Sequence, residues 1–122
     1  MKSILIVEDS TTTRSLIRAV IEELGDFNIV EAPTGFDALK LLPAQDFDLV
    51  VTDINMPDIN GLELINFVKS NPRYSSIPLI IVTTERSEED KKRGIALGAT
   101  AYVTKPFKAL ELQDTVKRVM NL

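Results

Sequence analysis

Ile4-Leu5-Ile6-Val7 is an apolar run of four residues that stops at two acids, Glu8-Asp9. Three later stretches repeat this arrangement, in which an apolar run ends at a polar group. They are Leu49-Val50-Val51-Thr52 before Asp53, Leu79-Ile80-Ile81-Val82 before Thr83-Thr84, and Ala101-Tyr102-Val103-Thr104 before Lys105-Pro106. Runs of this length are typical of buried strands. If the strands are parallel, their polar ends meet at one edge of the sheet, where open α/β folds bind ligands.

The composition is that of an ordinary soluble domain. The chain has 122 residues, of which 44% are hydrophobic and 26% are charged, and this length corresponds to about one domain. It contains no cysteine and no histidine, which excludes disulfides, thiol nucleophiles and a phosphohistidine within the chain. The net charge of −4, with scattered Lys and Arg, argues against nucleic-acid binding, which usually requires a basic surface.

No segment is predicted to enter a membrane. The apolar run that follows Met1-Lys2-Ser3 ends at Glu8, so it is shorter than the roughly 7–15 residues of a signal-peptide core. No other run approaches the ~18 apolar residues of a membrane span. We therefore expect a cytoplasmic protein without a membrane partner.

Cap and turn residues divide the chain into alternating strands and helices. The predicted strands cover residues 4–7, 27–32, 48–52, 79–82 and 101–104. Predicted helices begin at Ser10 or Thr11, Thr34, Leu62, Ser87 and Ala109, and the first three end near Gly25, Pro43 and Asn71. The second to fourth strands are apolar enough to be covered on both faces, as in a parallel sheet. The predicted fold class is α/β, a doubly wound five-stranded parallel sheet with five helices, in one domain covering residues 1–122.

The three acids at the predicted sheet edge indicate a magnesium site. Taken alone, Asp9 is equally well explained as a cap of the following helix, and Asp53 as a turn former. Together, however, Glu8, Asp9 and Asp53 place three like charges around one point, which is costly without a cation. Mg²⁺ prefers carboxylate and water oxygens, and an aspartate can accept a phosphoryl group covalently.

Lys105 and Thr83 supply what a phosphoryl group requires. A lysine at a sheet edge is usually only solvated, and a threonine at a strand end is usually only a β-branched strand residue with no functional role. Beside Asp53, however, the Lys105 ammonium offers a compact positive charge for phosphate, and the Thr83 hydroxyl can donate a hydrogen bond to a phosphoryl oxygen. Pro106 restricts the loop and could hold a cis peptide bond that directs Lys105.

With these residues in view, the chain resembles the receiver domain of bacterial two-component response regulators over nearly its whole length. The shared motifs are Ile4-Leu5-Ile6-Val7-Glu8-Asp9-Ser10, Asp53-Ile54-Asn55-Met56-Pro57 with Gly61, Val82-Thr83-Thr84-Glu85, and Tyr102-Val103-Thr104-Lys105-Pro106-Phe107. The resemblance implies a flavodoxin-like sheet with strand order 2-1-3-4-5. One departure is Thr84, where the family usually has a smaller residue. This bulkier side chain is expected to hinder water or donors that approach the phosphate.

The resemblance also implies a role for each site residue. Asp53 would be the phosphoacceptor, contacted by Lys105 after phosphorylation. Mg²⁺ would be held by Asp9, Asp53 and the backbone carbonyl of Asn55, and Glu8 would contribute through water. Thr83 and Tyr102 would form a coupled switch that reshapes the face made by the fourth helix, fifth strand and fifth helix, where a downstream protein would bind.

The expected function is therefore a stand-alone receiver. It would accept a phosphoryl group from a sensor histidine kinase or from a small donor such as acetyl phosphate, catalysing only its own phosphorylation and dephosphorylation. Ser10 to Arg14, Asn55-Met56-Pro57 and Tyr102 favour a chemotaxis-type regulator. The alternatives are a phosphorelay intermediate and a receiver cut from a larger regulator.

Two other classes of protein share part of this pattern. A flavodoxin-like electron carrier would bind a flavin phosphate at Ser10-Thr11-Thr12-Thr13, but Glu8-Asp9 would repel that phosphate. A haloacid-dehalogenase-type phosphatase would require a second Asp where Asn55 stands. Both are less consistent with the sequence than a receiver.

Overall fold

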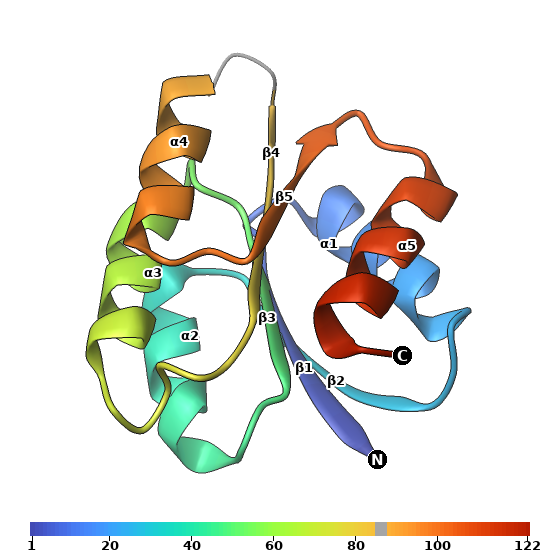
Figure 1. The fold of residues 1–122 in the computed structure, drawn as a ribbon, viewed down its shortest axis with the longest axis horizontal. Helices are drawn as coiled ribbons and strands as arrows, with labels where there is room; N and C mark the ends of the chain where they lie inside the picture. Colours follow the sequence, from blue (N-terminus) through green and yellow to red (C-terminus); the bar gives the residue numbers. More distant parts are fainter. Residues whose placement is uncertain (85–87) are drawn as a thin grey trace.

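A parallel sheet with helices on both faces forms the centre of the protein in a computed structural model that describes residues 1–84 and 88–122 (Figure 1). The strands are β1 (Lys2–Val7), β2 (Phe27–Ala32), β3 (Leu49–Thr52), β4 (Leu79–Thr84) and β5 (Ala101–Lys105). The helices are α1 (Thr11–Glu22), α2 (Gly35–Leu41), α3 (Gly61–Ser70), α4 (Glu88–Leu97) and α5 (Ala109–Met120), with a short 3₁₀ turn at Leu42–Ala44. Within these residues the strand order is β2-β1-β3-β4-β5. The predicted fold class and strand order are confirmed.

Each face of the sheet is covered by its own group of helices. Figure 1 shows α2, α3 and α4 on one side of the sheet, and α1 and α5 on the other. Strand side chains alternate between the two faces, so Leu5 and Val7 pack beneath α2 and α3, whereas Ile4 and Ile6 pack beneath α1 and α5. The sheet is thus covered by helices on both faces, and the polar residues that follow its strands lie at the strand ends.

The second strand is less buried than the sequence predicts, since it was expected to be covered on both faces like the third and fourth strands. Residues of β3 and β4 are almost entirely buried, but β2 is partly exposed along its length. The reason is its position, because among the described strands β2 pairs with β1 alone and forms one border of the sheet. Its polar residues Asn28 and Glu31 make side-chain hydrogen bonds to neighbouring segments there.

The predicted helix starts agree with the structure where it describes them. The Ser10 hydroxyl accepts a hydrogen bond from the Thr13 amide (3.3 Å), and the Thr34 hydroxyl accepts one from the Asp37 amide (3.0 Å). The predicted start of the fourth helix at Ser87 lies outside the described residues. The first helix ends at Glu22, before the predicted stop at Gly25, because the chain tightens into a turn in which the Leu24 amide binds the Ile21 carbonyl (3.0 Å).

None of the helices in the described ranges, 1–84 and 88–122, is long and apolar enough to cross a bilayer.

Candidate functional site

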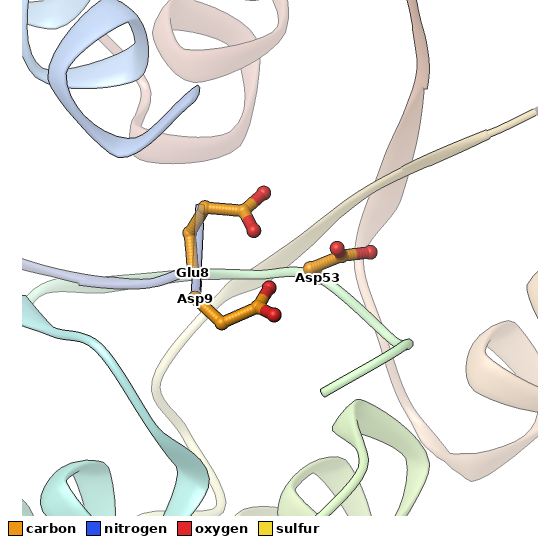
Figure 2. A group of neighbouring side chains, drawn as sticks. All are labelled: Glu8, Asp9 and Asp53. Atoms are coloured by element: carbon orange, nitrogen blue, oxygen red, sulfur yellow. The ribbon is translucent and has the colours of Figure 1, made fainter. Parts of the chain in front are cut away.

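Three carboxylates meet where β1 and β3 end, as the sequence predicts. Glu8 and Asp9 follow β1 directly, and Asp53 follows β3. One oxygen from each lies within 4.8 Å of the others, and Figure 2 shows the Glu8 and Asp9 carboxylates directed to the same side as that of Asp53. The strand pairing explains this arrangement, because Val7 lies beside Thr52 and the Asp53 amide donates to the Val7 carbonyl (3.1 Å).

The Lys105 amine completes the cluster from the end of β5. It donates a 2.6 Å hydrogen bond to Glu8 and a 3.1 Å hydrogen bond to Asp53. The Lys105–Pro106 peptide bond is cis, as Pro106 allowed. The structure therefore brings together all four charged side chains of the predicted site.

Local hydrogen bonds orient the two buried acids. The second oxygen of Asp53 accepts the Ile54 amide (2.7 Å), and the second oxygen of Glu8 accepts the Ser10 amide (3.2 Å). Gly61 is required beside them, since a Cβ at that position would overlap the carbonyl oxygen of Asp53. The carboxylates are thus held by the backbone of the loops that carry them.

Sequence reasoning missed the role of Arg14, which supports the site from α1. Its guanidinium donates to the Glu8 carbonyl (2.8 Å) and to the Glu31 carboxylate on β2 (3.0 Å). Arg18 also donates to Glu31 (2.8 Å). An arginine near the start of a helix is usually exposed to solvent, so no local sequence pattern indicates this contact.

Burial sets the electrostatics of the site. Glu8 is only 1% exposed, and burial raises the pKa of its carboxyl group, although the hydrogen bond from Lys105 opposes this change. Burial acts to lower the pKa of Lys105, but hydrogen bonds and charges from Glu8 and Asp53 outweigh it, so the pKa of Lys105 is raised. The cluster carries more acids than bases, which leaves a negative excess when its groups are ionised.

This donor set fits a magnesium ion. It offers carboxylate oxygens on adjacent loops, and Asp9 is exposed to solvent and can keep water ligands. Asn55 is exposed on the loop that follows Asp53, but its predicted role as a carbonyl ligand stays a prediction.

Thr83 lies at the same edge of the sheet, and its hydroxyl group is buried. Its side chain is completely buried, and its Oγ1 has no hydrogen-bond partner among the residues that the structure describes. A buried hydroxyl without a partner carries a free-energy cost. Thr84 is exposed and borders a shallow hollow together with Lys105 and Pro106.

Tyr102 lies on the same face of the sheet as Thr83. Val82 and Val103 are paired and pack beneath α1 and α5, so their neighbours Thr83 and Tyr102 face the other side. The Tyr102 side chain is 46% exposed, and its ring centroid lies 5.1 Å from the amine of Lys91 on α4. The predicted switch residues therefore share one face, with Tyr102 in an outward position.

Lys91 was also missed by sequence reasoning. It is only 2% exposed, and its amine donates to the Thr104 hydroxyl (2.8 Å) in addition to contacting Tyr102. In the sequence Lys91 stands within a run of charged residues, and such a run is typical of a solvated helix face. Only the packing of α4 against β5 shows that this lysine is buried.

Two buried acids, one exposed acid and a lysine thus meet at the ends of parallel strands in an α/β protein, and this donor set fits a magnesium ion. The family profile of the response regulator receiver domain matches residues 4–117. A chemotaxis protein CheY from Pseudomonas aeruginosa is 35% identical over 118 residues, which cover 97% of this chain and 95% of that protein. This chain belongs to the response regulator receiver family of two-component signalling.

Two solved structures support the same assignment. The chemotaxis protein CheY4 of Vibrio cholerae has a TM-score of 0.89 at 34% identity, with 98% of each chain covered. The receiver domain of a sensor histidine kinase from Pseudomonas aeruginosa has a TM-score of 0.88 at 25% identity, with 99% of this chain and 98% of that chain covered. That second protein is described with a magnesium ion coordinated in its active site cleft.

Proposed function

We propose that the protein accepts a phosphoryl group on the carboxylate of Asp53 and thereby changes its binding to a downstream protein. The observation that carries the proposal is the cluster in which Lys105 contacts Glu8 at 2.6 Å and Asp53 at 3.1 Å, beside Asp9. Positioned charges of both signs are the main requirement of phosphoryl transfer.

The transfer itself is an in-line displacement. An oxygen of Asp53 attacks the phosphorus, and the bond from phosphorus to the donor breaks, with its electron pair leaving on the donor. The donor is a phosphohistidine of a sensor histidine kinase or a small acyl phosphate, because this chain has no histidine of its own. The product is an aspartyl phosphate, and later attack of water on its phosphorus releases inorganic phosphate and returns the free carboxylate. Its own phosphorylation and dephosphorylation are the only reactions assigned to the protein.

Each residue of the cluster has a defined part in this reaction. Asp9, Asp53 and the Asn55 carbonyl would hold Mg²⁺, with Glu8 acting through water, and the ion would offset the repulsion between the carboxylate and the phosphoryl group. Lys105 would turn from the carboxylates to a phosphoryl oxygen. The hydrogen bond from the Ile54 amide keeps the carboxylate of Asp53 oriented in the meantime.

The switch follows from the unpartnered hydroxyl of Thr83. A phosphoryl oxygen on Asp53 would give this hydroxyl an acceptor, and its movement would leave room on the face that it shares with Tyr102. The Tyr102 ring would then turn inward and change the surface formed by α4, β5 and α5, where the downstream protein binds. Shifting such an equilibrium almost completely takes about 5 kcal/mol of differential interaction.

A chemotaxis-type output is supported by the 35% identity to CheY over nearly the whole chain. Onward transfer in a phosphorelay is the second candidate, favoured by the similarity to the receiver domain of a sensor histidine kinase. Transfer of the phosphoryl group from the purified phosphoprotein to a histidine phosphotransfer protein would favour the relay.

The phosphoacceptor assignment can be tested with acetyl phosphate and Mg²⁺. We expect the wild-type protein to gain one acid-stable, base-labile phosphoryl group, and Asp53→Asn to gain none. Asp26→Asn, at an exposed acid in another part of the surface, is the matched control and should be labelled normally. Undiminished labelling of Asp53→Asn at another residue would refute the assignment.

A further inference from the structure

The loop between β3 and α3 is joined to the start of α2 by the carboxylate of Asp58. One oxygen accepts the Gly35 amide (3.2 Å) and the other accepts the Phe36 amide (2.9 Å). Asp58 lies on the same loop as Asp53 and Asn55, yet both of its partners belong to a helix that contributes nothing else to the site. The Asp58 side chain therefore connects the loop that carries the site to helix α2.

These two hydrogen bonds complete the first turn of α2. The Asp37 amide binds the Thr34 hydroxyl (3.0 Å), and the Ala38 amide binds the Thr34 carbonyl (3.1 Å). The first amides of a helix have no partner within the helix, and here Asp58 takes the two that Thr34 does not reach. The Phe36 amide also holds the pKa of Asp58 below its usual value, so the carboxylate is ionised at neutral pH.

Backbone packing holds the loop and the helix together at the same point. A Cβ on Gly35 would lie 2.7 Å from the Ile59 carbonyl oxygen and 2.8 Å from the Ile59 Cβ. Real Cβ contacts are longer than this, so the loop backbone lies directly against Gly35. The Asp58 bonds and the Gly35 contact are independent observations of one junction.

The other half of the loop is anchored in the core. Ile54 (2% exposed) and Met56 (9% exposed) are both buried, and the Gly61 amide donates to the Ile54 carbonyl (2.7 Å). Asn55 stands between these two buried residues and is exposed. The segment that carries Asn55 is thus held by burial on both sides of that residue and by the Asp58 junction farther along.

We infer that Asp58 is a positioning residue for the magnesium site and braces the loop of Asp53 and Asn55 against α2. This inference rests on the proposed function, because it concerns the same site. A loop that is already ordered loses less conformational entropy when the ion binds. Removing the brace should therefore weaken Mg²⁺ binding without removing any ligand.

The test compares Mg²⁺ affinity across variants, measured by titrating the full chain with MgCl₂ and following backbone amide shifts by NMR. We expect Asp58→Ala to bind Mg²⁺ about tenfold more weakly, the range found for outer residues that orient metal ligands. Asp58→Asn keeps one acceptor oxygen and should fall between Asp58→Ala and the wild type. The rate of labelling by acetyl phosphate should fall at limiting Mg²⁺ and recover at saturating Mg²⁺.

Thr34→Ala is the matched control, because it removes the other cap of α2 and leaves the loop contacts in place. It should lower stability but leave Mg²⁺ affinity unchanged. Wild-type affinity in both Asp58 variants, or an equal loss of affinity in Thr34→Ala, would overturn the inference. These results are separate from the labelling of Asp53→Asn, so the positioning role and the proposed function can fail independently.

Discussion

The Lys105 amine and the Glu8 carboxylate lie 2.6 Å apart, although the two residues are 97 positions apart in the chain. Glu8 is almost entirely buried, and the amine is its charged partner. The two residues come from β5 and from the end of β1, strands that are not neighbours in the sheet. This ion pair therefore spans the strand ends of β3 and β4 and closes the site around Asp53.

Breaking this pair should destabilise the protein. We expect Lys105→Met to lower the free energy of unfolding by about 3 kcal/mol, since it leaves a buried carboxylate without a partner. The double variant Glu8→Gln with Lys105→Met should recover part of the loss. Urea unfolding of the single and double variants measures both effects, and an additive result would contradict the coupling.

The decrease in the free energy of unfolding caused by Lys105→Met should depend on pH. Burial already raises the pKa of Glu8, and removing the amine raises it further. The folded variant then binds a proton more tightly than the unfolded chain, so its stability increases as the pH falls through the folded-state pKa. The difference from wild type should be smaller at about pH 5 than at about pH 8; an equal difference at both would argue against a buried, unpaired Glu8.

Thr83→Val should stabilise the unphosphorylated protein by about 1 kcal/mol, because it replaces a buried hydroxyl that has no partner with a methyl group. Thr115→Val is the matched control. Its hydroxyl is also buried but donates to the Glu111 carbonyl (2.9 Å), so its removal should not stabilise the fold. Urea unfolding distinguishes the two variants, and equal effects would contradict the assignment of Thr83 as the unsatisfied group.

Lys91→Met should shift Tyr102 toward an inward position. The lysine amine over the ring favours the exposed rotamer, and a contact of this kind is worth about a two- to fivefold change in a population ratio. With ring-labelled tyrosine, the Tyr102 NMR signal of Lys91→Met should move toward its position in the beryllofluoride complex. Lys92→Met, at the exposed neighbouring lysine, should leave the signal unchanged. A similar movement in both variants would contradict a specific role for Lys91.

Glu31→Gln should lower stability by about 0.5–1 kcal/mol at neutral pH. Hydrogen bonds from Arg18 and Arg14 lower the pKa of Glu31. Its stabilisation is therefore present above the unfolded-state pKa of about 4.3, and it is lost as the pH falls through the lower folded-state value. Urea unfolding at about pH 7 and about pH 3 should show a lower free energy of unfolding for Glu31→Gln than for the wild type only at the higher pH. A difference of the same size at both would contradict the ion pair as its cause.

The strand ends of the site were predictable because each lies in a strong local pattern. An apolar run followed by Asp53 or by Glu8-Asp9 indicates a buried strand that ends at an acid, and parallel pairing then requires these ends to meet. By contrast, no local pattern distinguishes Lys91 or Asp58 from an ordinary surface charge. Their contacts depend on how α4 packs against β5 and how the β3–α3 loop meets α2. The roles of Asn55 as a carbonyl ligand and of Thr84 beside the phosphate stay predictions.

The order of residues along the chain was enough to establish a doubly wound α/β fold with acids, a hydroxyl and a lysine at one edge, because apolar periodicity and strand length are local properties. The tertiary structure determined which polar groups are buried from solvent and which of them form hydrogen bonds or ion pairs. Burial of Glu8, the unpaired hydroxyl of Thr83 and the amine over Tyr102 all arise from contacts between distant segments. Desolvation and pairing depend on three-dimensional neighbours, which no stretch of sequence specifies by itself.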